Sequence, residues 1–345
     1  MLQSGWSVVV SGMPRPPRIQ VSSSASLFHH CVSRVVDRNF VFGIHERDVF
    51  RKVLRQVESF SGVRVVTWTI LSNHFHVLLE VVPAPAVELT DDEILERCRA
   101  LYPRRVMEQI EWEFGDAQRR GGGALERLRR RFLLRMWNLS EFMKTLKQKF
   151  TIWFNRHHDR VGTLWESRFK SVLVEGSWQC LLKVAAYVDL NAVRAGLAKD
   201  PKDYRWCGYA EAVGGDRRAR KGLAAALDDI GESASWREAG PRYRKILYGI
   251  GGETSVKVGF SRAEIAKVWV EGGRLSLAQL LRCRVRYFTD GAVLGGEAFV
   301  DAFFERQREH FGARRESGAR RMRGAEWGAI RALRDLRVQP LSLPT

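Results

Sequence analysis

The stretch ILSNHFHVLLEVV, residues 70–82, places two histidines, His74 and His76, inside an otherwise apolar run. The composition is typical of a buried β-strand, in which successive side chains point to opposite faces. His74 and His76 would then lie side by side, with Phe75 and Val77 on the other face. Two imidazoles about 7 Å apart along a strand can share one metal ion. The alternative is a hydrogen-bonded histidine pair on an exposed face. Two histidines are too few ligands to hold a metal ion, so a third ligand would have to come from elsewhere in the fold.

The segments around this stretch predict the fold. GVRVVTWTIL, residues 62–71, is rich in β-branched residues, and a short turn at Ser72-Asn73 would join it to the histidine strand as a hairpin. The other predicted elements are a strand at 27–36, a helix at 45–60, a helix at 139–158, a strand at 169–174 and a helix at 178–196. The resulting order is β-α-β-β-α-β and then one more helix. It predicts an α+β fold, a ferredoxin-like antiparallel sheet with helices on one face.

The chain divides into three parts. Residues 1–25 are rich in Pro and Ser and are predicted to be a flexible leader. Residues 26–212 hold the predicted ferredoxin-like domain, with a helical insertion at about 83–137 that is interrupted by RRGGG. Residues 213–345 form a basic, mostly helical C-terminal region. Within it, residues 260–286 suggest a helix-turn-helix DNA reader, and the basic run at 314–324 suits contact with a nucleic-acid backbone.

The charge of the chain predicts an anionic partner. There are 57 Lys and Arg residues against 39 Asp and Glu, which gives a net charge of +18. Such an excess points to nucleic acid or to an anionic membrane surface. No apolar run reaches the length of a membrane-spanning helix, and the first residues do not resemble a signal peptide. The five cysteines are scattered without a CxxC pair, so we expect free thiols in a reducing cytoplasm. A DNA partner would make this cytoplasmic protein nucleoid-associated.

The helix predicted at 178–196 carries a second chemical pair, Tyr187 and Asn191. They are four residues apart and therefore project from the same side of the helix. Taken singly, each has an ordinary explanation, as a core tyrosine and as a residue near a helix end. A tyrosine hydroxyl is a weak nucleophile at neutral pH, but a nearby metal that polarises a phosphate makes it competent. The Asn191 oxygen would complete a His/His/carboxamide site that suits Mg²⁺ or Mn²⁺.

Several ordered motifs together resemble a known family. They are NHFHVLLE at 73–80, FMKTLKQKFTIWFNRHHDRVGTLWESRFKSVLVE at 142–175, YVDLNAVRAGL at 187–197 and DYRWCGYAEAVGG at 203–215. They resemble the REP-associated tyrosine transposases of the single-tyrosine HUH (His–hydrophobe–His) superfamily over roughly residues 26–212. LLRCRVRYFTDGAVLGGEAFVDAFFE, residues 280–305, also resembles a C-terminal extension of some members.

The resemblance implies a role for each motif residue. His74 and His76 match the metal-binding histidine pair, Tyr187 matches the nucleophile, and Asn191 matches the third protein ligand. The implied activity is cleavage and rejoining of single-stranded hairpin DNA through a 5′-phosphotyrosine, by proteins that work as dimers. The chain departs from the family in having Asn191-Ala192 in place of Asn-Pro, and in the long stretch from residue 83 to 137.

Basic side chains near these motifs are candidate phosphate contacts. They are Lys147, Lys149, Arg156, Arg168, Lys170 and Arg194. The ordinary alternative is a solvated basic face over an aromatic core, and we expect Trp165 to be a core anchor rather than a base-stacking residue. His29, His30, His45, His157 and His158 are not assigned to the metal, although either His29 or His30 should face the site.

Three functions compete at this stage. The first is the metal-dependent single-strand endonuclease and strand-transferase. The second is a DNA-hairpin-binding protein on the same fold whose catalysis is weak or lost. The third is a metal hydrolase unrelated to DNA, which the net charge and the lack of a carboxylate-rich ligand set disfavour.

Overall fold

A computed structural model describes most of the chain. The described residues are 25–227, 235–248, 284–311, 314–323, 327–333 and 341–342. Residues 1–24 of the predicted leader and 260–283 of the predicted helix-turn-helix lie outside them. Within the described ranges there is no helix that is both long and apolar enough to cross a membrane.

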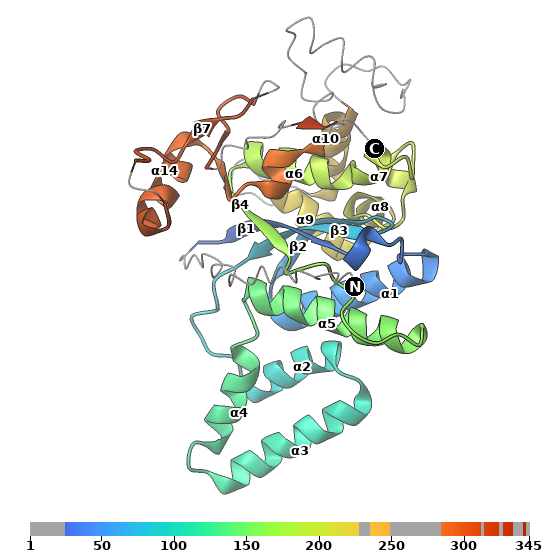
Figure 1. The fold of residues 1–345 in the computed structure, drawn as a ribbon. Coiled ribbons are helices and arrows are strands. Elements are labelled where there is room, and N and C mark those ends of the chain that lie inside the picture. Colours follow the sequence, from blue (N-terminus) through green and yellow to red (C-terminus); the bar gives the residue numbers. More distant parts are fainter. Residues whose placement is uncertain are drawn as a thin grey trace, which may run out of the picture.

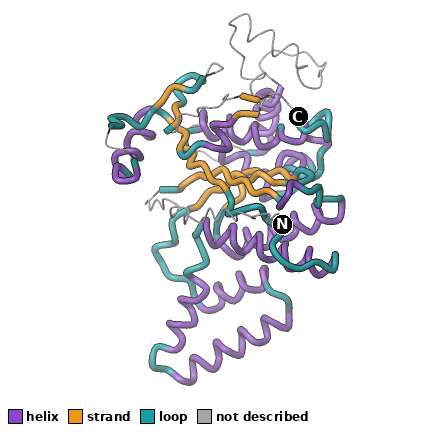
Figure 2. Tube along the Cα trace, in the orientation of Figure 1, coloured by secondary structure: helices purple, strands orange, loops and turns teal. Residues whose placement is uncertain are grey.

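A central sheet lies between two layers of helices (Figures 1 and 2). Its first four strands are β1 Leu27–Arg34, β2 Arg64–Ile70, β3 His74–Val81 and β4 Lys170–Val174. They lie in the order β2-β3-β1-β4, and neighbours pair antiparallel. This order, with helical crossovers after β1 and β3, is the ferredoxin-like one. The predicted α+β fold and the predicted hairpin between β2 and β3 are therefore confirmed.

The residues of β3 alternate between the two faces of the sheet as the sequence predicted. Phe75, Val77 and Leu79 pack into the core on the α1 side. Leu78 packs on the opposite side, and His76 shares its face. The strand is buried on both faces because helices cover both, which explains its nearly continuous apolar sequence.

Helices α1 Ile44–Ser61 and α5 Leu139–His157 cover one face of the sheet. The side chain of Asn138 accepts hydrogen bonds from the amides of Ser140 and Glu141, which caps the start of α5. Gly62 ends α1 in the left-handed conformation that glycine adopts without strain. The insertion helices extend away from this layer in Figure 1: α2 Asp91–Leu101, α3 Arg104–Arg120 and α4 Ala124–Leu133.

A second helical layer covers the other face. It contains α6 Trp178–Asp189, α7 Asn191–Arg194, α8 Gly208–Val213, α9 Arg217–Ala226 and α10 Trp236–Tyr248. The prediction of helices on one face of the sheet is therefore right only for the two crossover helices, α1 and α5. Helices formed by later residues bury the second face as well. Helix α9 lies so close to β2 that a Cβ at Gly222 would lie 2.5 Å from the Val65 carbonyl oxygen.

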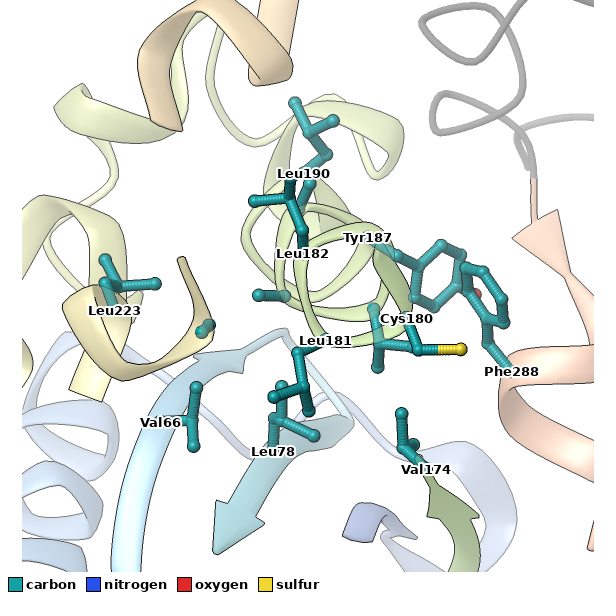
Figure 3. Packing of buried hydrophobic residues seen from close by; sticks show 14 of the residues in the cluster. Val66, Leu78, Val174, Cys180, Leu181, Leu182, Tyr187, Leu190, Leu223 and Phe288 are labelled. Carbon is teal, nitrogen blue, oxygen red and sulfur yellow. The ribbon is translucent and has the colours of Figure 1, made fainter. Parts of the chain in front are cut away.

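Helix α6 forms the centre of the second core (Figure 3). Leu181 points toward Leu78 of the sheet, whereas Leu182 lies on the side of the helix away from the sheet, near Leu190, and all three side chains are buried. Burying each leucine contributes about 1.5–3 kcal/mol. This packing fixes the orientation of the helix that carries Tyr187.

The C-terminal residues add helices, as predicted, and also short strands that were not predicted. They are β5 Arg284–Val285, α13 Arg286–Asp290, β6 Val293–Gly295, α14 Glu297–Arg306, β7 Arg320–Arg321, β8 Arg331–Ala332 and β9 Leu341–Ser342. Strand β6 pairs parallel with β4, so the sheet continues as β4-β6-β8-β7. Short 3-10 helices occur at Val36–Arg38, Pro201–Asp203 and Arg308–His310. The C-terminal region therefore completes the same sheet as residues 27–174.

The cysteines of the described residues are all buried: Cys31, Cys98, Cys180 and Cys207. Cys98, Cys180 and Cys207 are free thiols, as the sequence indicated. Burial raises the pKa of Cys98 to about 11 and that of Cys180 to about 12. Thiols that stay protonated at neutral pH are poor nucleophiles, so these side chains act as core residues.

Candidate functional site

Strand β3 brings His74 and His76 to one point at the edge of the second helical layer. His74 is the first residue of the strand, and the ring centres of the two histidines are 5.2 Å apart. Two imidazoles that bind one metal at about 2.1 Å per nitrogen have ring centres about 5 Å apart. The spacing of the pair therefore fits a shared metal ion.

Helix α6 brings Tyr187 against the histidines. The Tyr187 ring centre is 6.1 Å from that of His76, in an edge-to-face arrangement. The Arg194 guanidinium lies over the Tyr187 ring, 3.9 Å from its centre. Phe288 of α13 contacts the same ring edge to face at 5.1 Å, as Figure 3 shows. The tyrosine is consequently only 1% exposed, although it forms part of the wall of a pocket.

The predicted single helix at 178–196 is wrong in one respect, because it breaks between α6 and α7. Side chains donate hydrogen bonds to main-chain carbonyl groups that would accept from main-chain amides in a continuous helix. The Tyr187 carbonyl accepts a hydrogen bond from Arg194 at 2.7 Å, and the Val188 carbonyl accepts one from the Asn191 amide nitrogen at 3.2 Å. Gly196 then ends α7 with a φ of 68°, as expected for the residue after a helix.

These bonds also orient Asn191. Since the Val188 carbonyl can only accept, the Asn191 amide nitrogen is the donor, and its carboxamide oxygen remains an acceptor. Among the described residues, no group of three or more His, Cys, Asp or Glu side chains could hold a metal. Asn191 lines the same pocket as His74 and His76, so its carboxamide oxygen is available as a further donor beside the two imidazoles.

The hydrogen bonds of the two histidines set their tautomers. The Nδ1 of His74 lies 2.7 Å from the Asn73 side-chain oxygen, so a neutral ring carries its proton on Nδ1 and its lone pair on Nε2. The Nδ1 of His76 lies 3.0 Å from Nε2 of His30. Burial, and then the repulsion that positive charge on nearby His30, His74 and Arg194 would exert, holds the pKa of His76 well below its usual value. Neutral imidazole is the form that binds metal ions.

One pocket of about 380 Å³ collects the predicted residues (called the site pocket below). Its lining includes His74, His76, Tyr187, Asn191, Arg168, Lys170 and Arg194. Among the described residues, six cationic and two acidic side chains line the site pocket. The cationic ones are Arg34, Arg38, Arg168, Lys170, Arg194 and Arg286, and the acidic ones are Glu166 and Asp290. Lys170 pairs with Asp290 at 2.6 Å. The remaining charge makes the pocket attractive to a phosphate.

The other predicted phosphate contacts lie elsewhere. Lys147 donates to the Ser167 carbonyl at 2.9 Å and lies beside the site pocket. Lys149 is half-buried and donates to the Leu101 carbonyl at 2.7 Å, and burial and Arg135 lower its pKa. Neither Lys149 nor the exposed Arg156 is among the described residues that line the site pocket. Trp165 is buried and donates from Nε1 to Thr151, as a core anchor would.

The structure adds residues that the sequence did not assign. His30 contacts His76, and Arg34 lines the site pocket from the same strand four residues later. The period of two along β1 was a signal that could have selected both. Phe288 and Arg286 gave no comparable signal, because about 100 residues separate them from Tyr187.

Comparisons with known proteins find a distant structural similarity. No protein-family model matches the chain, and no curated protein matches it. A solved structure described as "Structure of the REP associates tyrosine transposase bound to a REP hairpin" aligns with 65% of this chain and 97% of that chain. The sequence identity is 14% and the TM-score is 0.35, which is a distant similarity.

Proposed function

We propose that the protein is a metal-dependent endonuclease and strand-transferase acting on single-stranded hairpin DNA. The observation that carries the proposal is the site pocket itself. His74, His76, Tyr187 and Asn191 come from positions up to 117 residues apart and line one basic pocket of about 380 Å³. A pure binding protein has no need for a paired-imidazole and carboxamide donor set beside a tyrosine.

The residues suggest the following chemistry. The Tyr187 oxygen attacks the scissile phosphorus, the bond from phosphorus to the 3′ oxygen breaks, and a 5′-phosphotyrosine and a free 3′-hydroxyl result. The phenolic proton is lost to solvent and the leaving 3′ oxygen takes up a proton. A divalent metal bound by His74, His76 and Asn191 would supply charge stabilisation at the phosphate. Arg168 and Arg194 would hold the phosphate in place through their fixed positive charge.

A larger groove next to the site pocket suits the flanking strand. It runs along the outer face of α5, has a volume of about 1120 Å³, and shares Ser167 and Arg168 with the site pocket. Ile152 in its wall is 61% exposed, and Lys144 adds a cation. Apolar surface beside cations is what the bases and phosphates of a single strand need.

One observation favours the second candidate, a DNA-hairpin-binding protein with weak catalysis. Tyr187 is 1% exposed beneath Arg194 and Phe288, so the nucleophile meets the scissile phosphate only from within the site pocket. A phosphate that cannot reach the hydroxyl would be bound without being cut.

The deciding experiment uses labelled single-stranded hairpins from the DNA flanking the gene, incubated with the protein and Mn²⁺. A covalent protein–DNA adduct on a denaturing gel that disappears in Tyr187→Phe supports the nuclease. Hairpin binding without an adduct in any divalent metal supports the binding protein. Neither binding nor adduct with any hairpin would contradict both.

A further inference from the structure

His30 has no role in the proposed chemistry, yet it lies at the centre of the site. Its side chain is fully buried on β1, and its ring is nearly parallel to that of His76 (interplanar angle 20°), with ring centres 5.2 Å apart. Its ring is edge to face with Tyr187 at 6.1 Å. His30 is absent from the described residues that line the site pocket, so it does not meet a ligand there.

Both ring nitrogens of His30 are engaged. Nδ1 lies 2.7 Å from the main-chain carbonyl oxygen of Phe288, and Nε2 lies 3.0 Å from Nδ1 of His76. A carbonyl only accepts, so Nδ1 of His30 carries a proton and donates it. His30 is fully buried, and burial favours the neutral ring. A neutral ring that is protonated on Nδ1 has its lone pair on Nε2, so Nε2 accepts.

The direction of the second bond follows from the first. Since Nε2 of His30 accepts, His76 donates from Nδ1, and the lone pair of His76 lies on Nε2. A metal-binding histidine commonly donates its other ring N–H in this way, which fixes the tautomer and the ring plane. The partner here is a second histidine, which is itself anchored on a main-chain carbonyl 258 residues away in sequence.

We propose that His30 is a positioning residue that holds His76 in the Nδ1–H tautomer, with the Phe288 carbonyl as its anchor. The proposal rests on the proposed function and deepens it. His30 would orient the Nε2 lone pair of His76 toward a bound metal. It also makes α13 part of the site. The segment Arg286–Asp290 covers Tyr187 with one side chain and fixes the histidine relay with one carbonyl.

The first test needs neither metal nor activity. Long-range ¹H–¹⁵N correlation spectra of the metal-free protein report which nitrogen of His76 carries the proton. We expect Nδ1–H in the wild type and in His30→Gln, whose amide can both donate and accept. His30→Leu should shift His76 toward the other tautomer. His29→Gln, the neighbour on the same strand, should leave it unchanged. A wild-type His76 protonated on Nε2 would overturn the proposal, and this result does not depend on any variant folding.

The second test measures Mn²⁺ affinity by calorimetry with folding checked by circular dichroism. We expect His30→Leu to weaken binding about 10–100-fold and His30→Gln to restore most of it. Equal affinity in wild type and folded His30→Leu would contradict the positioning role. If the wild type binds no Mn²⁺ and forms no adduct, the proposed function fails, whereas the His76 tautomer still decides whether the relay exists.

Discussion

Helix α6 separates two buried polar clusters whose central residues are only two positions apart. On one side, Tyr187 meets His30, His76 and Arg194 at the wall of the site pocket. On the other side, Asp189 is fully buried between the sheet and α10. Both clusters place polar groups in the core, but they differ in where their hydrogen bonds end.

In the Asp189 cluster, the polar groups hydrogen-bond to one another. One carboxylate oxygen accepts from the Thr67 hydroxyl at 2.7 Å and from the Tyr209 amide at 3.1 Å, and the other accepts from the Tyr243 hydroxyl at 2.5 Å. Burial raises the pKa of Asp189 to about 7, although these three hydrogen bonds act to lower it. Asp189 therefore faces away from the site, as its position on the helix requires.

The Tyr187 cluster opens on a cavity. His74, His76 and Asn191 line the site pocket with tautomers and an amide orientation that leave lone pairs on nitrogen and oxygen. A shifted pKa marks both sides of the helix, so it cannot by itself select the functional one. What separates a structural cluster from a chemical one here is whether its polar atoms face each other or face a cavity.

The largest expected effect distinguishes the two tyrosines. Tyr187→Phe should reduce the covalent adduct by at least about 10³-fold, because the nucleophilic oxygen is gone. Its melting temperature should stay close to that of the wild type. Tyr243→Phe should form the adduct at nearly the wild-type rate, as the matched control on the Asp189 side. Loss of the adduct in both variants would show that the comparison is wrong.

The next effect is the pH dependence of stability. The raised pKa of Asp189 means that the folded protein keeps a proton that the unfolded chain loses above its ordinary pKa near 3.8. This contribution to stability is complete below pH 4 and is lost as pH rises through about 7. It amounts to at most about 4 kcal/mol.

Urea unfolding of wild type and Asp189→Asn between pH 4 and 8 measures this contribution as a difference. The lowered pKa of His30 acts with the opposite sign, because a buried neutral histidine loses stability as pH falls through about 4. That effect is common to both proteins and cancels. A difference that does not change with pH would mean that Asp189 is ionised throughout.

A smaller effect is expected for the stability of Tyr243→Phe. The variant leaves one oxygen of a fully buried carboxyl group without its donor, which costs about 1–3 kcal/mol. Tyr187→Phe should cost less, since in this structure the Tyr187 ring is held by packing and by Arg194. Equal losses in urea unfolding would show that the two tyrosines are equally structural.

The smallest effect concerns salt. Arg168 lines both the site pocket and the α5 groove, so Arg168→Gln should lower the slope of log affinity against log salt for a DNA hairpin by about 1. Arg244 pairs with Asp200 at 2.7 Å on the Asp189 side, and Arg244→Gln should leave the slope unchanged. The same change in both slopes would place DNA on both sides of α6.

The local sequence contained the period of two that puts His74 beside His76 and the spacing that relates Tyr187 to Asn191. It also contained the order of strands and helices that defines the ferredoxin-like sheet. These features depend on neighbouring residues and on burial, which leave a direct mark on the pattern of apolar positions. The break between α6 and α7 left no such mark, because it comes from side chains taking main-chain carbonyls.

By itself, the sequence determined the chemical identity of the candidate site: two imidazoles, a tyrosine and a carboxamide in a strongly basic chain. Only the tertiary structure decided that His30 faces His76, that Phe288 anchors it, and that Lys149 lies away from the site pocket. The reason is physical. Periodicity records which side of its own element a residue occupies, whereas a contact across hundreds of residues depends on how separate elements pack.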